Sequence, residues 1–71
     1  MAAVAWETIE PFFSQAFAGR GQVEREDVIN LAFAASGSDD VIDAIDTLGS
    51  RIFRSIEDAK AFLVGEGVVT A

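Results

Sequence analysis

The residues of this sequence with the clearest chemical potential are the aspartates of the stretch SDDVIDAID, residues 38–46. Clustered carboxylates can bind metal ions, act as acids or bases when burial separates their pKa values, or contact a basic protein surface. In a helix, Asp39, Asp43 and Asp46 follow i, i+4 and i+7 spacing and therefore lie on one face. The composition of the rest of the chain shows which of these three roles the aspartates can have.

Catalysis near neutral pH usually relies on residue types that this chain lacks. The sequence contains no histidine, cysteine or tyrosine, so the common general base, thiolate nucleophile and phenolic acid are missing. The carboxylates fall at predicted helix starts or on predicted polar faces, where water keeps them ionised. We therefore expect no catalytic residue, no cofactor and no enzyme activity; an unrecognised carboxylate enzyme is the least favoured function.

The arrangement of the acids also disfavours a metal site. Calcium takes about six to eight oxygen ligands, usually from alternating acids on a loop that ends with a bidentate glutamate. Residues 38–46 show neither feature, so we predict no metal ligand. In the simplest interpretation the first two aspartates stabilise the positive end of a helix dipole, and the last two are solvated or paired with Arg51 or Arg54.

The charge of the chain argues against nucleic acid and membrane surfaces as partners. Twelve acidic and five basic residues give a net charge of −7, which repels phosphate groups. A helix–turn–helix motif around Gly37 would direct Ser38, Asp39 and Asp40 at DNA, where the carboxylates are repelled. We expect a protein partner, either a basic one or a second copy. The alternative is an acidic mimic of nucleic acid that inhibits a basic nucleic-acid-binding protein.

The sequence also gives an expectation for location. No apolar run approaches the roughly 18 residues of a membrane span. The first residues lack a basic segment and carry Glu7 and Glu10 within an apolar stretch, which is atypical of a secretory signal. We expect a cytoplasmic protein.

Hydrophobic periodicity and capping residues predict four helices, which cover residues 9–18, 25–35, 39–48 and 55–64. Thr8, Ser38 and Ser55 are suitable N-caps because a hydroxyl oxygen can accept a free backbone N–H at a helix start. Gly37 is expected to end the second helix. Short apolar stretches around Val23 and Phe53 leave room for a minimal two-stranded β-ribbon.

Aromatic residues are concentrated near the start of the chain. Trp6, Phe12, Phe13 and Phe17 are four of the seven aromatic residues. Phe12 lies about 100° around a helix from Phe13, so one core can hardly bury both rings. The pattern suggests that Trp6 and Phe12 form an exposed partner-binding patch; the alternative is that a small domain needs large rings to complete its core.

The middle of the chain resembles a small bacterial family, domain of unknown function 2795, over about Val23 to Leu63. The residues that carry the resemblance are Asp27, Ala35, Asp40, Val41, Leu48, Arg51, Phe53, Ser55 and Asp58. The resemblance implies a compact, mostly helical domain and no reaction. Gly49 and Glu24 depart from the family pattern, which commonly has proline and a Ser or Thr cap there, so the second helix is expected to fray or to begin differently.

These observations predict an all-α fold, a small orthogonal bundle of about four helices, in a single domain of residues 1–71. Within it we distinguish an aromatic N-terminal helix (1–20), a family-like helical core (22–64) and an apolar tail (65–71). The predicted function is that of a non-catalytic protein-interaction or small regulatory module. Its partner-binding residues are predicted to be Trp6, Phe12, Asp39, Asp43 and Asp46.

Overall fold

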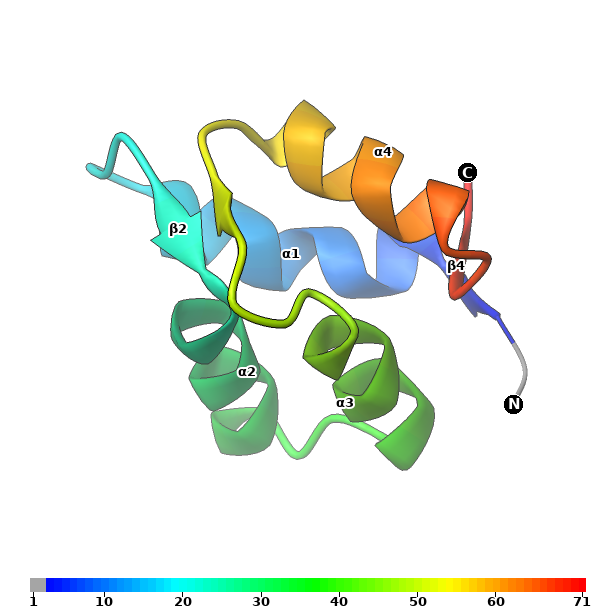
Figure 1. Ribbon diagram of the computed structural model, residues 1–71. Coiled ribbons are helices and arrows are strands. Elements are labelled where there is room, and N and C mark those ends of the chain that lie inside the picture. The colour runs from blue at the N-terminus through cyan, green and yellow to red at the C-terminus, as the bar shows by residue number, and fades with distance from the viewer. Residues whose placement is uncertain (1–2) are drawn as a thin grey trace.

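The chain alternates four helices with four two-residue strands in a computed structural model that describes residues 3–71 (Figure 1). The helices are α1 (Trp6–Phe17), α2 (Arg25–Ala34), α3 (Asp39–Asp46) and α4 (Ile56–Gly65). The strands are β1 (Val4–Ala5), β2 (Val23–Glu24), β3 (Ile52–Phe53) and β4 (Val69–Thr70). The prediction of a small, mostly helical domain is confirmed.

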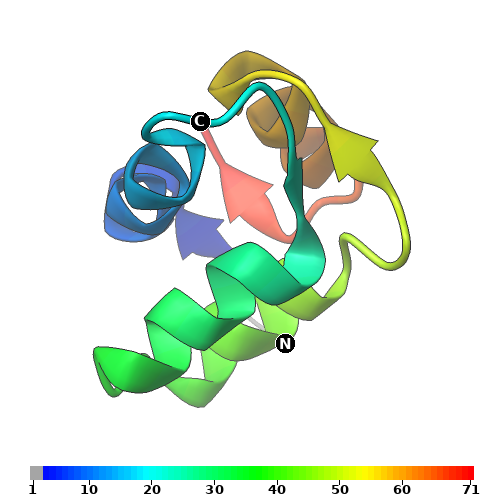
Figure 2. The ribbon, with the colours of Figure 1, turned by 90° about the vertical axis from the view of Figure 1, so that its left-hand side faces the viewer.

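Helix α1 occupies the middle of the molecule. It packs against α2 and α4, while α2 and α3 pack side by side as a hairpin (Figures 1 and 2). Figure 2 views α1 almost end-on while α2 runs across the picture, so these two helices cross steeply. The described chain therefore forms two layers, with α1 and α4 in one and the α2–α3 hairpin in the other.

Helix α1 begins one turn earlier than the sequence predicts. It starts at Trp6 with Ala5 as its N-cap, so Thr8 is not the cap. The reason is burial: Trp6, Ile9 and Phe13 lie at i, i+3 and i+7 and all face the core. Pro11 is consequently inside the helix and leaves the Glu7 carbonyl without its i+4 donor. Both residues are exposed, so water can reach that carbonyl.

The buried side chains within residues 3–71 are all apolar, and they form one core that draws on every helix. Phe13, Ile9, Ile45, Leu48 and Leu63 are the largest of those that are completely enclosed. No buried side-chain nitrogen or oxygen in this part of the chain lacks a hydrogen-bond partner. The core is therefore held by apolar burial, and the polar chemistry lies on the surface.

Two strand pairs close the fold. The predicted ribbon is present: β2 and β3 are antiparallel, with Val23 opposite Phe53 and Glu24 opposite Ile52. A second pair was not predicted. β1 and β4 run parallel, with the Val4 N–H donating to the Val68 carbonyl over 2.9 Å. The apolar tail is thus docked beside the start of the chain.

The capping serines behave as predicted, whereas the end of α2 does not. Ser38 accepts the Val41 N–H at 3.3 Å and Ser55 accepts the Asp58 N–H at 3.1 Å. At the end of α2, Ser36 rather than Gly37 adopts the left-handed conformation, with φ of 57°. Gly37 is required for space instead, because its N–H lies 2.8 Å from the Ala32 carbonyl oxygen and an added Cβ would lie 3.1 Å from that oxygen.

We expect Ser36→Gly and Gly37→Ala to have opposite effects on stability. Ser36→Gly relieves a left-handed serine and should raise the free energy of unfolding by up to about 1 kcal/mol. Gly37→Ala crowds a backbone carbonyl and should lower it by about 1–3 kcal/mol. Urea denaturation followed by circular dichroism measures both. Gly21→Ala is the control, because a Cβ there meets no atom within 4 Å of the described chain; equal effects at positions 21 and 37 would contradict the steric explanation.

Candidate functional site

The predicted aromatic patch is largely absorbed by the core. Trp6 is only 8% exposed, and its ring centroid lies 5.5 Å from that of Phe13 and 5.8 Å from the Lys60 ammonium. Phe12 is half-buried against the same core. The expectation that Trp6 is exposed is therefore wrong, because its indole lies on the same face of α1 as Ile9 and Phe13 and joins their core. Neither ring is a strong candidate for partner contact.

A shallow pocket lies where α1 meets the β1–β4 pair, lined by Ala5, Trp6, Glu7 and Ala71. Its volume is about 220 Å³, below the roughly 300–1,000 Å³ of typical small-molecule sites. The pocket also lacks a convergent set of polar side chains. We do not regard it as a ligand site.

The large apolar side chains that are exposed lie elsewhere. Phe33 is 61% exposed on α2, Ile52 53% exposed on β3, and Val64 39% exposed on α4. Sequence reasoning did not select them as partner-binding residues. The sequence does predict that Phe33 is exposed, because Phe33 falls outside the apolar stripe formed by Val28 and Ala32 on the same helix.

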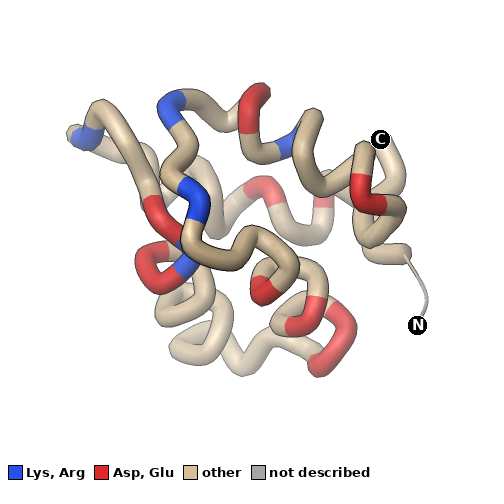
Figure 3. The backbone as a smooth tube through the Cα atoms, viewed as in Figure 1, with Lys and Arg blue, Asp and Glu red and all other residues tan. Residues whose placement is uncertain are grey.

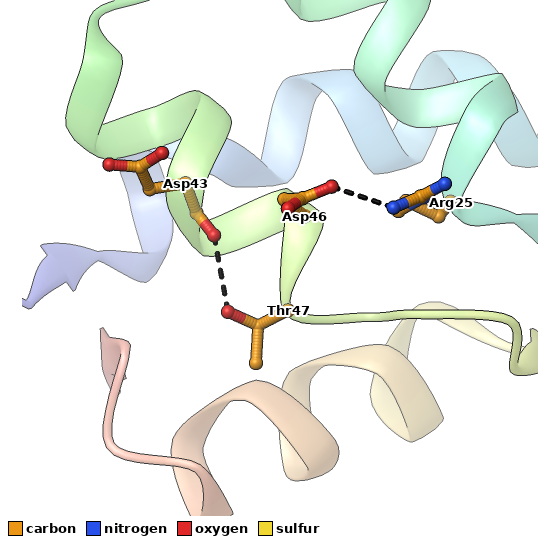
Figure 4. Close-up of polar contacts among 4 residues, drawn as sticks. All are labelled: Arg25, Asp43, Asp46 and Thr47. Carbon is orange, nitrogen blue, oxygen red and sulfur yellow. Dashed lines mark hydrogen bonds and ion pairs between the residues drawn. The ribbon is translucent and has the colours of Figure 1, made fainter.

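Helix α3 has one apolar face and one acidic face. Val41, Ala44 and Ile45 are buried. Asp39, Asp40 and Asp43 are exposed, and within residues 3–71 none of them lies in an ion pair. The Asp43 backbone carbonyl accepts a hydrogen bond from the Thr47 hydroxyl at 3.1 Å, while its carboxylate points away from the other residues drawn in Figure 4.

Asp46 differs from the other predicted aspartates because it is tied to α2. Its carboxylate lies 2.7 Å from the Arg25 guanidinium, and the two side chains are 60% and 43% exposed (Figure 4). An ion pair this exposed contributes at most about 1 kcal/mol. The structure thus keeps Asp39 and Asp43 together on a free surface and draws Asp46 toward Arg25, rather than toward Arg51 or Arg54.

All four arginines of the chain flank the β2–β3 ribbon. Arg20 and Arg25 stand on either side of β2, and Arg51 and Arg54 on either side of β3. Their positions are the blue segments around the ribbon in Figure 3, whereas the red segments of α3 lie below and to the right. The guanidinium of Arg51 also covers the Phe62 ring at 4.7 Å. Acidic residues at β2 and at the start of α2 stand among these arginines, so the ribbon end carries charges of both signs, whereas α3 carries acids alone (Figure 3).

The N-terminus of α2 is stabilised by Asp27. Its carboxylate accepts the Glu24 backbone N–H at 3.0 Å and lies 2.7 Å from the Arg20 guanidinium. These two contacts, in that order of importance, hold the pKa of Asp27 below its ordinary value of 3.8. Helix α2 starts directly after Glu24, its N-cap residue.

No site for metal chemistry is assembled by the described residues. Residues 3–71 contain no group of three or more acidic, histidine or cysteine side chains close enough to hold a metal ion. None of the helices in this range combines the length and apolar character needed to cross a bilayer.

Comparisons with known proteins returned no similar protein: no family model, no curated protein and no solved structure matches the chain significantly. The function of this protein must therefore be inferred from the residues on its own surface.

Asp27 should make stability depend on pH in the acid range. Because its folded pKa is lowered, its contribution is present above the unfolded pKa and is lost as pH falls through the folded pKa. We expect Asp27→Asn to lower the free energy of unfolding by about 0.5–2 kcal/mol at pH 7, with the difference from wild type vanishing below the folded pKa. Urea titrations across the acid range measure this difference.

Asp58→Asn is the matched control, since Asp58 holds the same helical position in α4 and its carboxylate makes no hydrogen bond within residues 3–71. Its effect should be smaller at pH 7. A difference between wild type and Asp27→Asn that persists unchanged at the lowest pH would contradict the assigned role.

Proposed function

We propose that this protein is a non-catalytic interaction module that binds a basic, partly apolar protein surface. The binding site is the acidic surface, which we define as Asp39, Asp40 and Asp43 of α3 together with Phe33 of α2. One observation carries the proposal: Asp39 and Asp40, exposed and without ion pairs in the described chain, stand at the same end of the α2–α3 hairpin as Phe33, the most exposed large apolar side chain, and exposed Asp43 follows one turn along α3.

The placement of these residues follows from the hairpin. α2 ends at Ala34 and α3 begins at Asp39, so only a short turn separates the last turn of one helix from the first turn of the other (Figure 2). Phe33 and the first aspartates of α3 therefore belong to one end of the molecule. Protein-binding sites often combine an aromatic side chain, which anchors the partner, with charged residues around it. Phe33 and the aspartates of α3 supply these two kinds of residue.

Electrostatics supports a basic partner. Like charges spaced along one helix repel by a few tenths of a kcal/mol per pair, and the helix dipole offsets this only at the first turn, where Asp39 and Asp40 stand. Asp43 lies beyond that turn. A cationic partner would offset the repulsion of all three, and steering by opposite charge would raise the association rate.

Mimicry of nucleic acid is the weaker interpretation of the same acids. A mimic needs an extended track of negative charge, whereas the arginines of this chain break the charge pattern around the ribbon (Figure 3). We therefore favour a compact protein contact over inhibition of a nucleic-acid-binding protein.

The family resemblance remains part of the proposal. Val41, Leu48 and Phe53 are buried, as core positions of a shared fold should be. Ser55 caps α4 through the Asp58 N–H. These contacts support a common structural role for the motif residues, and they carry no specific activity.

The proposal can be tested with a fluorescent peptide that alternates lysine and leucine, titrated with the protein and followed by anisotropy at physiological ionic strength, where charges are screened over about 8 Å. We expect the triple variant Asp39→Asn, Asp40→Asn, Asp43→Asn to bind about five- to a hundredfold more weakly, because each rim charge is worth a few tenths to 1 kcal/mol. Phe33→Ala should weaken binding separately without lowering stability, since Phe33 is 61% exposed.

The matched control neutralises three exposed glutamates away from the acidic surface, Glu10, Glu57 and Glu66. It changes the net charge by the same amount and should alter binding less than about twofold, because charges outside a contact act only through the screened field. Equal losses in the two triple variants would show that net charge alone attracts the peptide, and would overturn the proposal.

A further inference from the structure

The apolar tail, residues 65–71, is held to the rest of the molecule by few contacts. Val69 is buried and Val68 is half-buried, whereas the other tail residues are exposed. On the backbone, the Val4 N–H donates to the Val68 carbonyl at 2.9 Å, and Val4 lies opposite Val69 in the β1–β4 pair. Ordering each tail residue costs conformational entropy, and one valine side chain supplies most of the burial that offsets this cost. We therefore expect the tail to detach more readily than any helix.

Detachment of the tail leaves a defined slot. Strand β1 stays in place because it packs against α1 and α3, while the apolar space that Val69 fills and the Val4 N–H become free. An open strand edge of this kind binds another extended strand. The shallow pocket lined by Trp6 and Ala71 already shows that the tail leaves space unfilled beside β1. We define the strand slot as the space beside β1 that β4 fills (Figure 1).

Gly67 is the hinge between α4 and the tail strand. Its φ of 77° is left-handed, and its N–H donates to the Val64 carbonyl at 3.0 Å in the turn that brings the chain back to β1. Glycine adopts left-handed and extended conformations about equally well. Rotation at this single residue therefore converts the turn into an extended link without strain, and directs β4 away from its own slot.

We propose that two copies of the protein exchange their apolar tails, so that β4 of each copy fills the strand slot of the other. The structure shows which segment fits the slot, because β4 fills it within one copy. A second copy carries the identical segment and reproduces the contacts that β4 makes with β1 and the core, so only the hinge differs. Reciprocal exchange leaves no slot empty and closes a two-fold dimer. The exchange does not involve the acidic surface and is independent of the proposed function.

The tether sets the concentration at which exchange occurs. A short link holds the tail beside its own slot at an effective concentration on the order of millimolar. Wild type should therefore be monomeric at micromolar concentration and dimerise as the protein approaches millimolar concentration. Residues 67–70 carry no charge, so the dimer should persist at about 1 M salt, where a contact between charged surfaces is screened.

Gly67→Ala should favour the exchanged dimer. Alanine is disfavoured at a left-handed φ but not in an extended link, and each dimer relieves two such hinges. We expect the dimer dissociation constant, measured by sedimentation equilibrium, to fall at least about thirtyfold. Crowding does not contribute, because a Cβ at position 67 meets no atom within 4 Å of the described chain. Gly65→Ala is the matched control, since Gly65 has the same free space and is not left-handed; it should dimerise as wild type does.

Cysteine pairing identifies the segments that meet. The chain has no cysteine, so Val4→Cys and Val69→Cys can be placed in separate copies that both carry Gly67→Ala. Positions 4 and 69 lie opposite one another in the β1–β4 pair, at a strand spacing that suits a disulfide. When an equimolar mixture is oxidised, the disulfide between the two kinds of copy should exceed its statistical share over disulfides between like copies.

Circular dichroism confirms that each variant is folded. If Gly67→Ala is not, the cysteine experiment is made without it, near millimolar protein concentration. Three results would each overturn the inference: a wild type that stays monomeric at millimolar concentration, a folded Gly67→Ala variant that dimerises no better than Gly65→Ala, and a statistical mixture of disulfides.

Discussion

The structure depends on the burial of one face of α1. Ile9 and Phe13 are completely enclosed on that face, with Trp6 close above them. The helix packs against both α2 and α4, so it joins the two layers of the molecule. A chain of this size buries only about 60% of the surface exposed in its unfolded state. Two of the three buried aromatic rings within residues 3–71, Trp6 and Phe13, belong to α1.

That burial fixes the ends of the described chain. Because Trp6 faces the core, α1 must begin immediately after β1, and β1 in turn pairs with β4. Val69 of β4 is 3% exposed and joins the same core. A second contact between a strand pair and a helix involves Phe62 of α4, whose ring packs against the Phe53 ring and the Arg51 guanidinium. Together these contacts attach both strand pairs to the helices.

A wholly apolar core leaves all charge on the surface, where helix geometry sorts it. The buried stripe of α3 turns Asp39, Asp40 and Asp43 outward, and the short ribbon gathers the arginines at the other end of α2. The run of acids on α3 and the mixed charges around the ribbon are thus consequences of packing. The proposed interaction role uses the first of these, together with the exposed Phe33.

The sequence by itself determined the elements whose causes are local. Ser38 and Ser55 cap helices through hydrogen bonds to residues three positions ahead, and the apolar stripe of α3 follows from its own periodicity. Tertiary structure alone decided what depends on partners distant in the chain. The β1–β4 pair joins residues at opposite ends of the described chain, Asp46 meets Arg25 across 21 positions, and Trp6 turns inward. Local patterns carry no information about such contacts, because their free energy is gained only when the layers pack together.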